Sequence, residues 1–278
     1  MAEFRTVLSD LVLVESPRWH DDRLVFSDWG TGEIVALQSD GTRRTLGRVE
    51  GGMPFCLDRL PNGRLLAVTQ AGLMAVGPDG SLTAYADLGG LSEFAWNDIV
   101  VDGRGHAYVN NINHKFGGEF APGFIALATP DGPPRVVADD LAFPNGMAVT
   151  PDGSTLVVAE SYAGALTAYT IADDGSLTDR RVWADLASAA PDGICVDAEG
   201  AVWFAEVPGQ RCVRVAEGGE VLQSISADRG CFSCALGGPD RRTLYVTAAS
   251  WSAVMGEGAR TGQILAATVD VPGAGWPA

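Results

Sequence analysis

One hairpin that recurs six times along the chain constrains the fold more than any other feature of the sequence. Its clearest copy runs from Asn145 to Glu160, where an apolar strand, a Pro-Asp-Gly turn and a second, β-branched strand follow one another. Strands of this kind around a tight polar turn are typical of antiparallel pairs. Related turns recur about every 40 to 48 residues, at Arg23, Gly63, Gly105, Gly153, Gly200 and Arg241.

Each copy of the hairpin is followed by a second pair of strands that closes in its own polar turn, as at Asp40-Gly41 and Asp79-Gly80. Four strands per repeat at this period are typical of β-propeller blades. We therefore predict an all-β, six-bladed β-propeller with four strands per blade, formed by residues 1–278 as a single domain. Residues 4–13 are expected to complete the last blade beside 262–269. A sandwich with long loops is the alternative, but it does not explain six copies of one hairpin.

Composition and charge narrow the choice of partners. The 278 residues include 35 Gly and 15 Pro, which favour many tight turns over long helices. A formal net charge of −16 would repel nucleic acid and anionic membranes, so we expect a small-molecule substrate and neither of those partners. Residues 1–18 carry only a short apolar run, and no stretch is long enough to span a bilayer. We expect a cytoplasmic protein that is a monomer or a small homo-oligomer.

The five cysteines give little sign of a disulfide framework or a zinc site. Their number is odd, and the chain is too large to need covalent bridges. Cys231 and Cys234 form a C-x-x-C pair, but no second pair accompanies it. Reduced, buried thiols are the expectation.

One position in the repeat varies in a way that suggests chemistry. It lies eight residues before each turn position, at the start of the innermost strand of each blade, so its six copies should ring one end of the central channel. The six residues are Glu15, Phe55, Asn97, Asn145, Asp192 and Ser233. Two carboxylates and two carboxamides therefore converge from four blades. The alternative is that Asn145 and Asp192 only form turns with the glycines that follow them.

Clustered polar groups inside a channel need a compensating partner, because unpaired buried charge is costly. All four side chains offer oxygen, and the two negative charges would balance a divalent ion. We predict one divalent metal ion in the central channel, held by Glu15, Asn145, Asp192 and, directly or through water, Asn97. Hard cations suit this set, with Ca²⁺ first and Mn²⁺, Fe²⁺, Mg²⁺ or Zn²⁺ as alternatives.

The second strand of each hairpin should return to the same end of the channel, so the residues where these strands end are expected to form the walls of a pocket. His114 lies in a long loop of the third blade, where it could serve in acid–base chemistry or simply be solvated. The predicted substrate pocket consists of Trp29, Trp96, Asn110, His114, Glu160, Glu206 and Ser233.

With these motifs in place, the chain resembles the gluconolactonase and regucalcin family, also called senescence marker protein-like. The similarity extends over nearly the whole length. It is carried by Glu15 in Glu-Ser-Pro-Arg-Trp, Asn97 in Trp-Asn-Asp, Asn145 in Pro-Asn-Gly, Asp192 in Pro-Asp-Gly-Ile, and a Gly-Gly-Pro-Asp-Arg-Arg segment ending at Arg242. The resemblance implies a six-bladed propeller that hydrolyses lactones, or in some relatives organophosphates, with one catalytic divalent ion in the channel.

The chain departs from the family pattern at one place. Sugar-lactone hydrolases of the family commonly carry an arginine two residues before the third-blade asparagine, where this chain has Ala95 followed by Trp96. Together with Trp29, this difference favours a lactone less polar than a simple sugar lactone.

The expected activity is that of a divalent-metal-dependent lactonase, a carboxylic ester hydrolase. Metal-activated water would attack the lactone carbonyl, which the ion would polarise. Asp192 would take the proton, and Asn97 would orient the substrate or stabilise the oxyanion. The alternatives are a phosphotriesterase or an aromatic-ester hydrolase on the same scaffold, or a non-catalytic metal-binding propeller.

Overall fold

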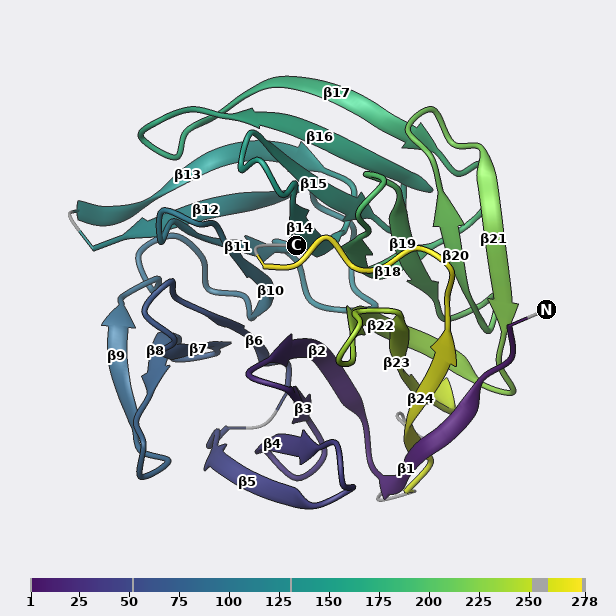
Figure 1. Cartoon of the computed structure of the whole chain (residues 1–278). Helices are drawn as coiled ribbons and strands as arrows, with labels where there is room; N and C mark the ends of the chain where they lie inside the picture. Colours follow the sequence, from purple (N-terminus) through teal and green to yellow (C-terminus); the bar gives the residue numbers. More distant parts are fainter. Residues whose placement is uncertain (1, 52, 131, 252–259, 277–278) are drawn as a thin grey trace.

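Six blades surround a central channel in the computed structural model, which describes residues 2–51, 53–130, 132–251 and 260–276 (Figure 1). Within these residues, 24 strands form six antiparallel sheets of four strands each. The predicted all-β, six-bladed architecture with four strands per blade is therefore confirmed.

The blades follow one another along the chain. The first three contain β2 (Val14–His20), β3 (Arg23–Asp28), β4 (Glu33–Gln38) and β5 (Arg43–Arg48); β6 (Cys56–Arg59), β7 (Leu65–Thr69), β8 (Gly72–Val76) and β9 (Leu82–Ala86); and β10 (Trp96–Val101), β11 (Ala107–Asn111), β12 (Gly123–Thr129) and β13 (Gly132–Leu141). The next two contain β14 (Pro144–Val149), β15 (Thr155–Glu160), β16 (Ala165–Ile171) and β17 (Leu177–Asp185); and β18 (Pro191–Val196), β19 (Val202–Glu206), β20 (Arg211–Val215) and β21 (Val221–Ser226).

The sixth blade joins the two ends of the chain. It contains β22 (Gly230–Gly237), β23 (Thr243–Ala249), β24 (Gly262–Thr268) and, as its outermost strand, β1 (Arg5–Leu11). Arg5 pairs with Ala266 and Leu11 with Gly262. The expectation that residues 4–13 complete the last blade is confirmed. Pairing covers the edge that β24 would otherwise expose.

Burial decreases outward across each blade. The second strands β11 and β19 are buried at every residue, whereas the outer strands β5, β13 and β17 are largely exposed. The apolar cores lie between neighbouring blades, where one sheet face packs on the next. This layering explains why the innermost hairpin of each repeat gave the clearest pattern in the sequence.

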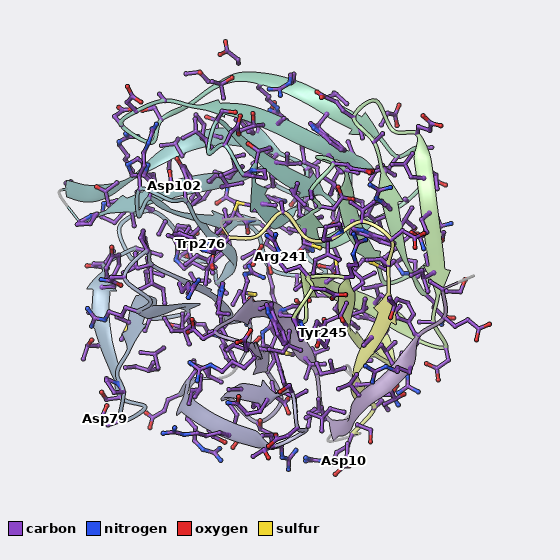
Figure 2. The ribbon with its side chains drawn as sticks, in the orientation of Figure 1. Asp10, Asp79, Asp102, Arg241, Tyr245 and Trp276 are labelled. Atoms are coloured by element: carbon purple, nitrogen blue, oxygen red, sulfur yellow. The ribbon has the colours of Figure 1, made fainter. Side chains whose placement is uncertain are left out.

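The C-terminal segment crosses the end of the channel that faces the viewer in Figure 1. Gly273 forms a β-bridge with Asp197, and its N–H donates a hydrogen bond to the carbonyl of Arg241. Arg241 in turn donates from Nη1 to the carbonyl of Ala274 over 3.2 Å. Arg241 and Trp276 both lie near the middle of the ring in this view (Figure 2). The segment therefore covers this end of the channel.

All five cysteines are buried and free, as expected from the sequence. Cys195 and Cys234 come from neighbouring blades and place their sulfur atoms 3.7 Å apart. Among the described residues, no helix combines the length and the apolar character needed to cross a bilayer.

Close packing of the innermost strands yields a first prediction. A Cβ added to Gly146 would lie 2.6 Å from the carbonyl oxygen of Asp192 and the Cα of Gly193, which are backbone atoms of the next blade. Because neither blade can move independently, Gly146→Ala should lower the free energy of unfolding by about 1–3 kcal/mol. Denaturant unfolding measures this change. Gly103→Ala is the control, since no atom of the described residues lies within 4 Å of its added Cβ. An equal loss in both variants would contradict the packing argument.

Candidate active site

β-Bulges place the predicted ligands at one end of the channel. Between Trp96 and Ile99 of β10, two residues stand opposite one residue of β11. The pairing shifts in the same way after Pro144 in β14 and after Pro191 in β18, and after Glu15 in β2. A bulge interrupts strand alternation and re-aims the side chains beside it. Each of the four polar positions of the repeat lies in or directly beside such a bulge.

Glu15 and Asp192 are the two carboxylates at this end of the channel. Glu15 is 7% exposed, and its Oε2 accepts a hydrogen bond of 2.9 Å from the backbone N–H of Ser16. Burial raises the pKa of Glu15 to about 8, and the negative charge of Asp98 adds to this effect. Burial likewise raises the pKa of Asp192 well above its usual value, with further contributions from Glu15 and Asp98. Burial therefore destabilises the charged form of both acids, and the charge of Glu15 adds to the effect on Asp192.

Asn97 and Asn145 stand beside the carboxylates and contact one another. Asn97 Nδ2 lies 3.4 Å from Asn145 Oδ1 and donates a shorter hydrogen bond, of 3.1 Å, to the carbonyl of Pro144. Asn145 Nδ2 donates to Ser161 Oγ over 3.3 Å, and that hydroxyl donates to the carbonyl of Pro191. These bonds link β10, β14 and β18, so the amide oxygens are held at the point where the three blades meet.

Asp98 is a buried acid beneath this site that the sequence reasoning did not single out. Its Oδ2 accepts a hydrogen bond of 2.9 Å from the N–H of Met147, and its Oδ1 lies 3.6 Å from Arg18 Nη2. Arg18 also approaches Asp58 to 3.8 Å. Strand alternation assigns Asn97 and Asp98 to opposite faces, but the bulge places both toward the channel. The one sequence feature that could have pointed to Asp98 is its position directly after Asn97.

The donor set fits a hard divalent cation. Glu15, Asp192, Asn97 and Asn145 supply carboxylate and carboxamide oxygens and no sulfur or imidazole. Among the described residues, Arg18 is the one cation acting on Glu15, and it already faces Asp58 and Asp98. A divalent ion would stabilise the charged form of these two carboxylates, which have no other cation beside them in the described structure. Within the described residues, no group of three or more His, Cys, Asp and Glu side chains is arranged to hold a metal; the set described here combines two acids with two carboxamides.

A cavity of about 690 Å³ opens above these side chains. Glu15, Asn97, Asn145 and Asp192 lie together in its lining. Its aromatic lining residues are Trp29, Phe94, Trp96, Phe116, Phe143, Phe232 and Trp251. Some of them touch: Phe116 packs edge-on against Trp251, with ring centroids 5.8 Å apart, and Phe232 stacks on the same indole at 5.8 Å. A polar group of oxygen donors therefore lies within a largely aromatic cavity, as is usual for small-molecule sites.

Four of the seven predicted pocket residues, Trp29, Trp96, His114 and Ser233, line this cavity. Trp29 donates from Nε1 to the carbonyl of Phe55, which fixes its ring. Trp96 is only 2% exposed and packs edge-on against Phe124, so it belongs to the core as much as to the pocket.

The other three predicted pocket residues, Asn110, Glu160 and Glu206, are absent from the lining. All three are at least 96% buried. Asn110 donates from Nδ2 to the carbonyl of Asn145 and accepts from the N–H of Asp98. Glu160 accepts from the N–H of Ala142 and pairs with Arg180, and Glu206 pairs with Arg211 at 2.6 Å. These side chains satisfy backbone groups and cations where their strands end, instead of facing the cavity.

His114 is held by its own loop. Its Nδ1 lies 2.7 Å from the carbonyl of Ile112 and 3.1 Å from that of Ala121. Because both partners are carbonyl oxygens, Nδ1 carries the proton and donates. The ring also packs against Phe120 and Phe143. The contacts of His114 are those of a residue that shapes the aromatic wall.

A six-bladed propeller with a group of oxygen donors at one end of its channel, within an aromatic cavity, defines the class of protein. A family model described as the SMP-30/Gluconolactonase/LRE-like region matches residues 13–250. The chain belongs to this family, as the sequence motifs indicated.

Relatives of known name cover nearly the whole chain. A 6-deoxy-6-sulfogluconolactonase of Pseudomonas putida is 26% identical over 96% of this chain and 94% of its own length. A pentonolactonase of Haloferax volcanii is 27% identical over 90% of this chain and 86% of its own. The solved structure of a calcium-binding protein, regucalcin, from Agrobacterium tumefaciens has a TM-score of 0.81 at 20% identity, covering 98% of this chain and 96% of the other. That last likeness concerns the fold alone.

The raised pKa of Glu15 predicts how chelator-treated protein responds to pH. In the unfolded chain Glu15 loses its proton near pH 4.5, whereas in the folded protein it keeps the proton up to about pH 8. The stability that this proton contributes is fully present below about pH 4.5 and is lost as the pH rises through 8. The unfolding temperature of the wild type should therefore fall as the pH rises across this window. The unfolding temperature of Glu15→Gln should fall less steeply, because the titrating carboxyl is absent. Glu220→Gln, at an exposed turn, is the control; identical slopes for wild type and Glu15→Gln would contradict the prediction.

Proposed function

We propose that this protein is a divalent-metal-dependent lactonase, with Ca²⁺ as the first candidate ion. The observation that carries the proposal is the convergence of Glu15, Asn97, Asn145 and Asp192 in one aromatic cavity. Two relatives named as lactonases support the reaction class. The choice of ion rests on the donor set, which consists of carboxylate and carboxamide oxygens.

Glu15, Asn145 and Asp192 would hold the ion, with Asn97 as a direct or water-mediated fourth ligand. A bound divalent ion supplies Lewis-acid polarisation of the carbonyl and lowers the pKa of water. Asp192 accepts the proton from the water that attacks the carbonyl carbon. As the ring C–O bond breaks, the same carboxyl returns the proton to the departing alkoxide oxygen. Asn97 orients the lactone through its amide, which the carbonyl of Pro144 positions. The product is a hydroxy acid.

The walls favour a lactone with an apolar substituent over a simple sugar lactone. Ala95 and Trp96 line the cavity where a guanidinium would be needed to bind sugar hydroxyls. Phe116, Phe232 and Trp251 form a continuous aromatic contact in the same lining. Burial of an alkyl or aryl group against these rings contributes roughly 25 cal/mol per Å² of apolar surface. An aromatic ester presents the same combination of carbonyl and apolar group, and it is the second candidate substrate.

The role of Asp192 is tested by replacing its carboxylate with an amide. Asp192→Asn should retain some metal but lower kcat by about 100-fold or more, because the proton acceptor is lost. Hydrolysis of a panel of γ- and δ-lactones, sugar-derived and aliphatic, by chelator-treated protein with Ca²⁺, Mn²⁺, Zn²⁺ or Fe²⁺ restored measures this. Asp173→Asn, at a fully exposed turn, is the control. Turnover that survives in Asp192→Asn would show that another group accepts the proton of the attacking water.

Two phenylalanines of one loop test the substrate preference. Phe116 and Phe120 are both 51% exposed, but only Phe116 lines the cavity. Phe116→Ala should raise KM several-fold for alkyl- or aryl-substituted lactones and change it little for unsubstituted γ-butyrolactone, because only the substituent reaches the ring. Phe120→Ala is the matched control and should leave both values unchanged. Equal effects of Phe116→Ala on both substrates would exclude the aromatic wall as a specificity determinant.

A further inference from the structure

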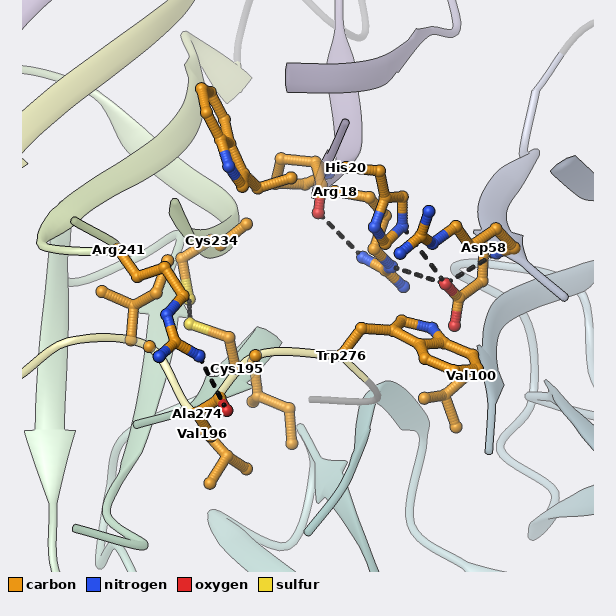
Figure 3. Close-up of a pocket in the computed structure, with 18 of the residues that line it drawn as sticks. Arg18, His20, Asp58, Val100, Cys195, Val196, Cys234, Arg241, Ala274 and Trp276 are labelled. Atoms are coloured by element: carbon orange, nitrogen blue, oxygen red, sulfur yellow. Dashed lines mark hydrogen bonds and ion pairs between the residues drawn. The ribbon is translucent and has the colours of Figure 1, made fainter. Parts of the chain in front are cut away.

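The opposite end of the channel contains a second, smaller cavity of about 170 Å³. Its walls include residues of β2, β6, β18 and β22 and residues 273–276 of the C-terminal segment (Figure 3). His20, Asp21 and Arg241 belong to the lining, and Asp21 and Arg241 are also exposed at the surface. The cavity therefore reaches the solvent, and it has room for a few molecules of the size of water or hydrogen peroxide.

Two cysteines share one wall of this smaller cavity. Cys195 lies on β18 and Cys234 on β22, the innermost strands of two neighbouring blades, and both line the cavity. Their sulfur atoms are 3.7 Å apart, and a dashed line joins them in Figure 3. Cys56, Cys212 and Cys231 do not contribute to this lining in the described structure. The pair thus combines contact between two thiols with access for a small oxidant.

The two strands are close enough for a covalent bond between these sulfur atoms. A Cβ added to Gly193 would lie 2.6 Å from the Cα of Ser233. Cys195 follows Gly193 by two residues, and Cys234 comes directly after Ser233. The sulfur of Cys234 also lies 3.6 Å from the carbonyl oxygen of Gly193, across the gap between the blades. A disulfide needs neighbouring backbones of this kind, so rotation of the two side chains can bring the sulfur atoms to bonding distance.

The surroundings keep both groups protonated until an oxidant arrives. The hydrogen bond to Cys234, together with burial, raises the pKa of Cys195 well above its usual value. Burial raises the pKa of Cys234 in the same direction. Because the thiolate is the nucleophile, the first attack on an oxidant should be slow at neutral pH. The second step needs no encounter in solution, since the partner sulfur is already in contact.

We propose that Cys195 and Cys234 are a site of oxidative modification, at which a peroxide converts the two thiols to a disulfide. One thiolate attacks a peroxide oxygen, the O–O bond breaks, and a sulfenic acid forms. The partner thiol then attacks the oxidised sulfur; the S–S bond forms, the S–O bond breaks, and water leaves. In total, two thiols and one hydrogen peroxide give one disulfide and two water molecules, so the sulfur atoms are oxidised and the peroxide is reduced.

The bond would join the fifth blade to the sixth, which is the blade that β1 completes. A cross-link between residues 195 and 234 restricts the unfolded chain and prevents these two blades from separating. Oxidation should therefore stabilise the closed ring. This inference does not depend on the proposed lactonase activity, because it concerns thiols at the other end of the channel.

Thiol counting on the native protein provides a direct test. Folded protein is treated with hydrogen peroxide, the peroxide is removed with catalase, and the free thiols are alkylated with N-ethylmaleimide in denaturant. Mass spectrometry should show the count of alkylated thiols falling from five to three. Peptide mapping without reduction should recover the peptide of Cys195 joined to that of Cys234. The unfolding temperature of the oxidised protein should rise by roughly 5–10 °C.

Three variants identify the pair. Cys195→Ala and Cys234→Ala keep a small apolar side chain, and neither should gain a linked peptide or a higher unfolding temperature after peroxide treatment. Cys212→Ala, which removes a buried thiol outside the cavity, should respond like the wild type. Three results would overturn the proposal: five alkylated thiols after peroxide treatment of the wild type, a link that joins Cys212 in place of Cys195, or a link that leaves the unfolding temperature unchanged. The first two need only wild-type protein, so they do not depend on the folding of a variant.

Discussion

Close approach of six innermost strands around one axis is the constraint on which the rest of the structure depends. Where β14 and β18 meet, the backbones are so near that Gly146 leaves no room for a methyl group. Side chains that point into the channel are therefore surrounded by protein on all sides, and a polar group there needs a partner within the ring. Along the axis these groups form two levels: the oxygen donors and Asp98, which line the larger cavity, and Arg18, His20 and Asp58, which line a smaller cavity of about 170 Å³ at the other end.

The repeat made the fold predictable from the sequence. Six copies of one hairpin predict six blades, and the shared position in the repeat predicts that Glu15, Asn97, Asn145 and Asp192 lie at one end of the channel. The closing strand at residues 4–13 was predictable because an uncovered edge of the last blade had to be paired. These inferences rest on backbone geometry that is nearly the same in every blade. The metal and the catalytic roles remain predictions.

Features that break the repeat could not be predicted in this way. The position of Asp98 could not be predicted, because a bulge places two neighbouring residues toward the channel. No periodic pattern in the sequence reveals such a bulge. Asn110, Glu160 and Glu206 were expected in the pocket because their strands end beside it. The structure shows that each binds backbone or side-chain partners nearby. The cavity around His20 depends on the C-terminal segment, whose position has no counterpart in the repeat.

The pairing of β1 with β24 also determines when the molecule can be completed during synthesis. Arg5 must remain without its partner strand until Ala266 has been made, so the sixth blade is the last to form. Contacts between residues so distant in sequence close slowly, because a long loop must be ordered first. During that interval the exposed edge of an unfinished blade can pair with another chain. The strand that closes the ring in the native protein is thus also the point at which a nascent chain is most susceptible to aggregation.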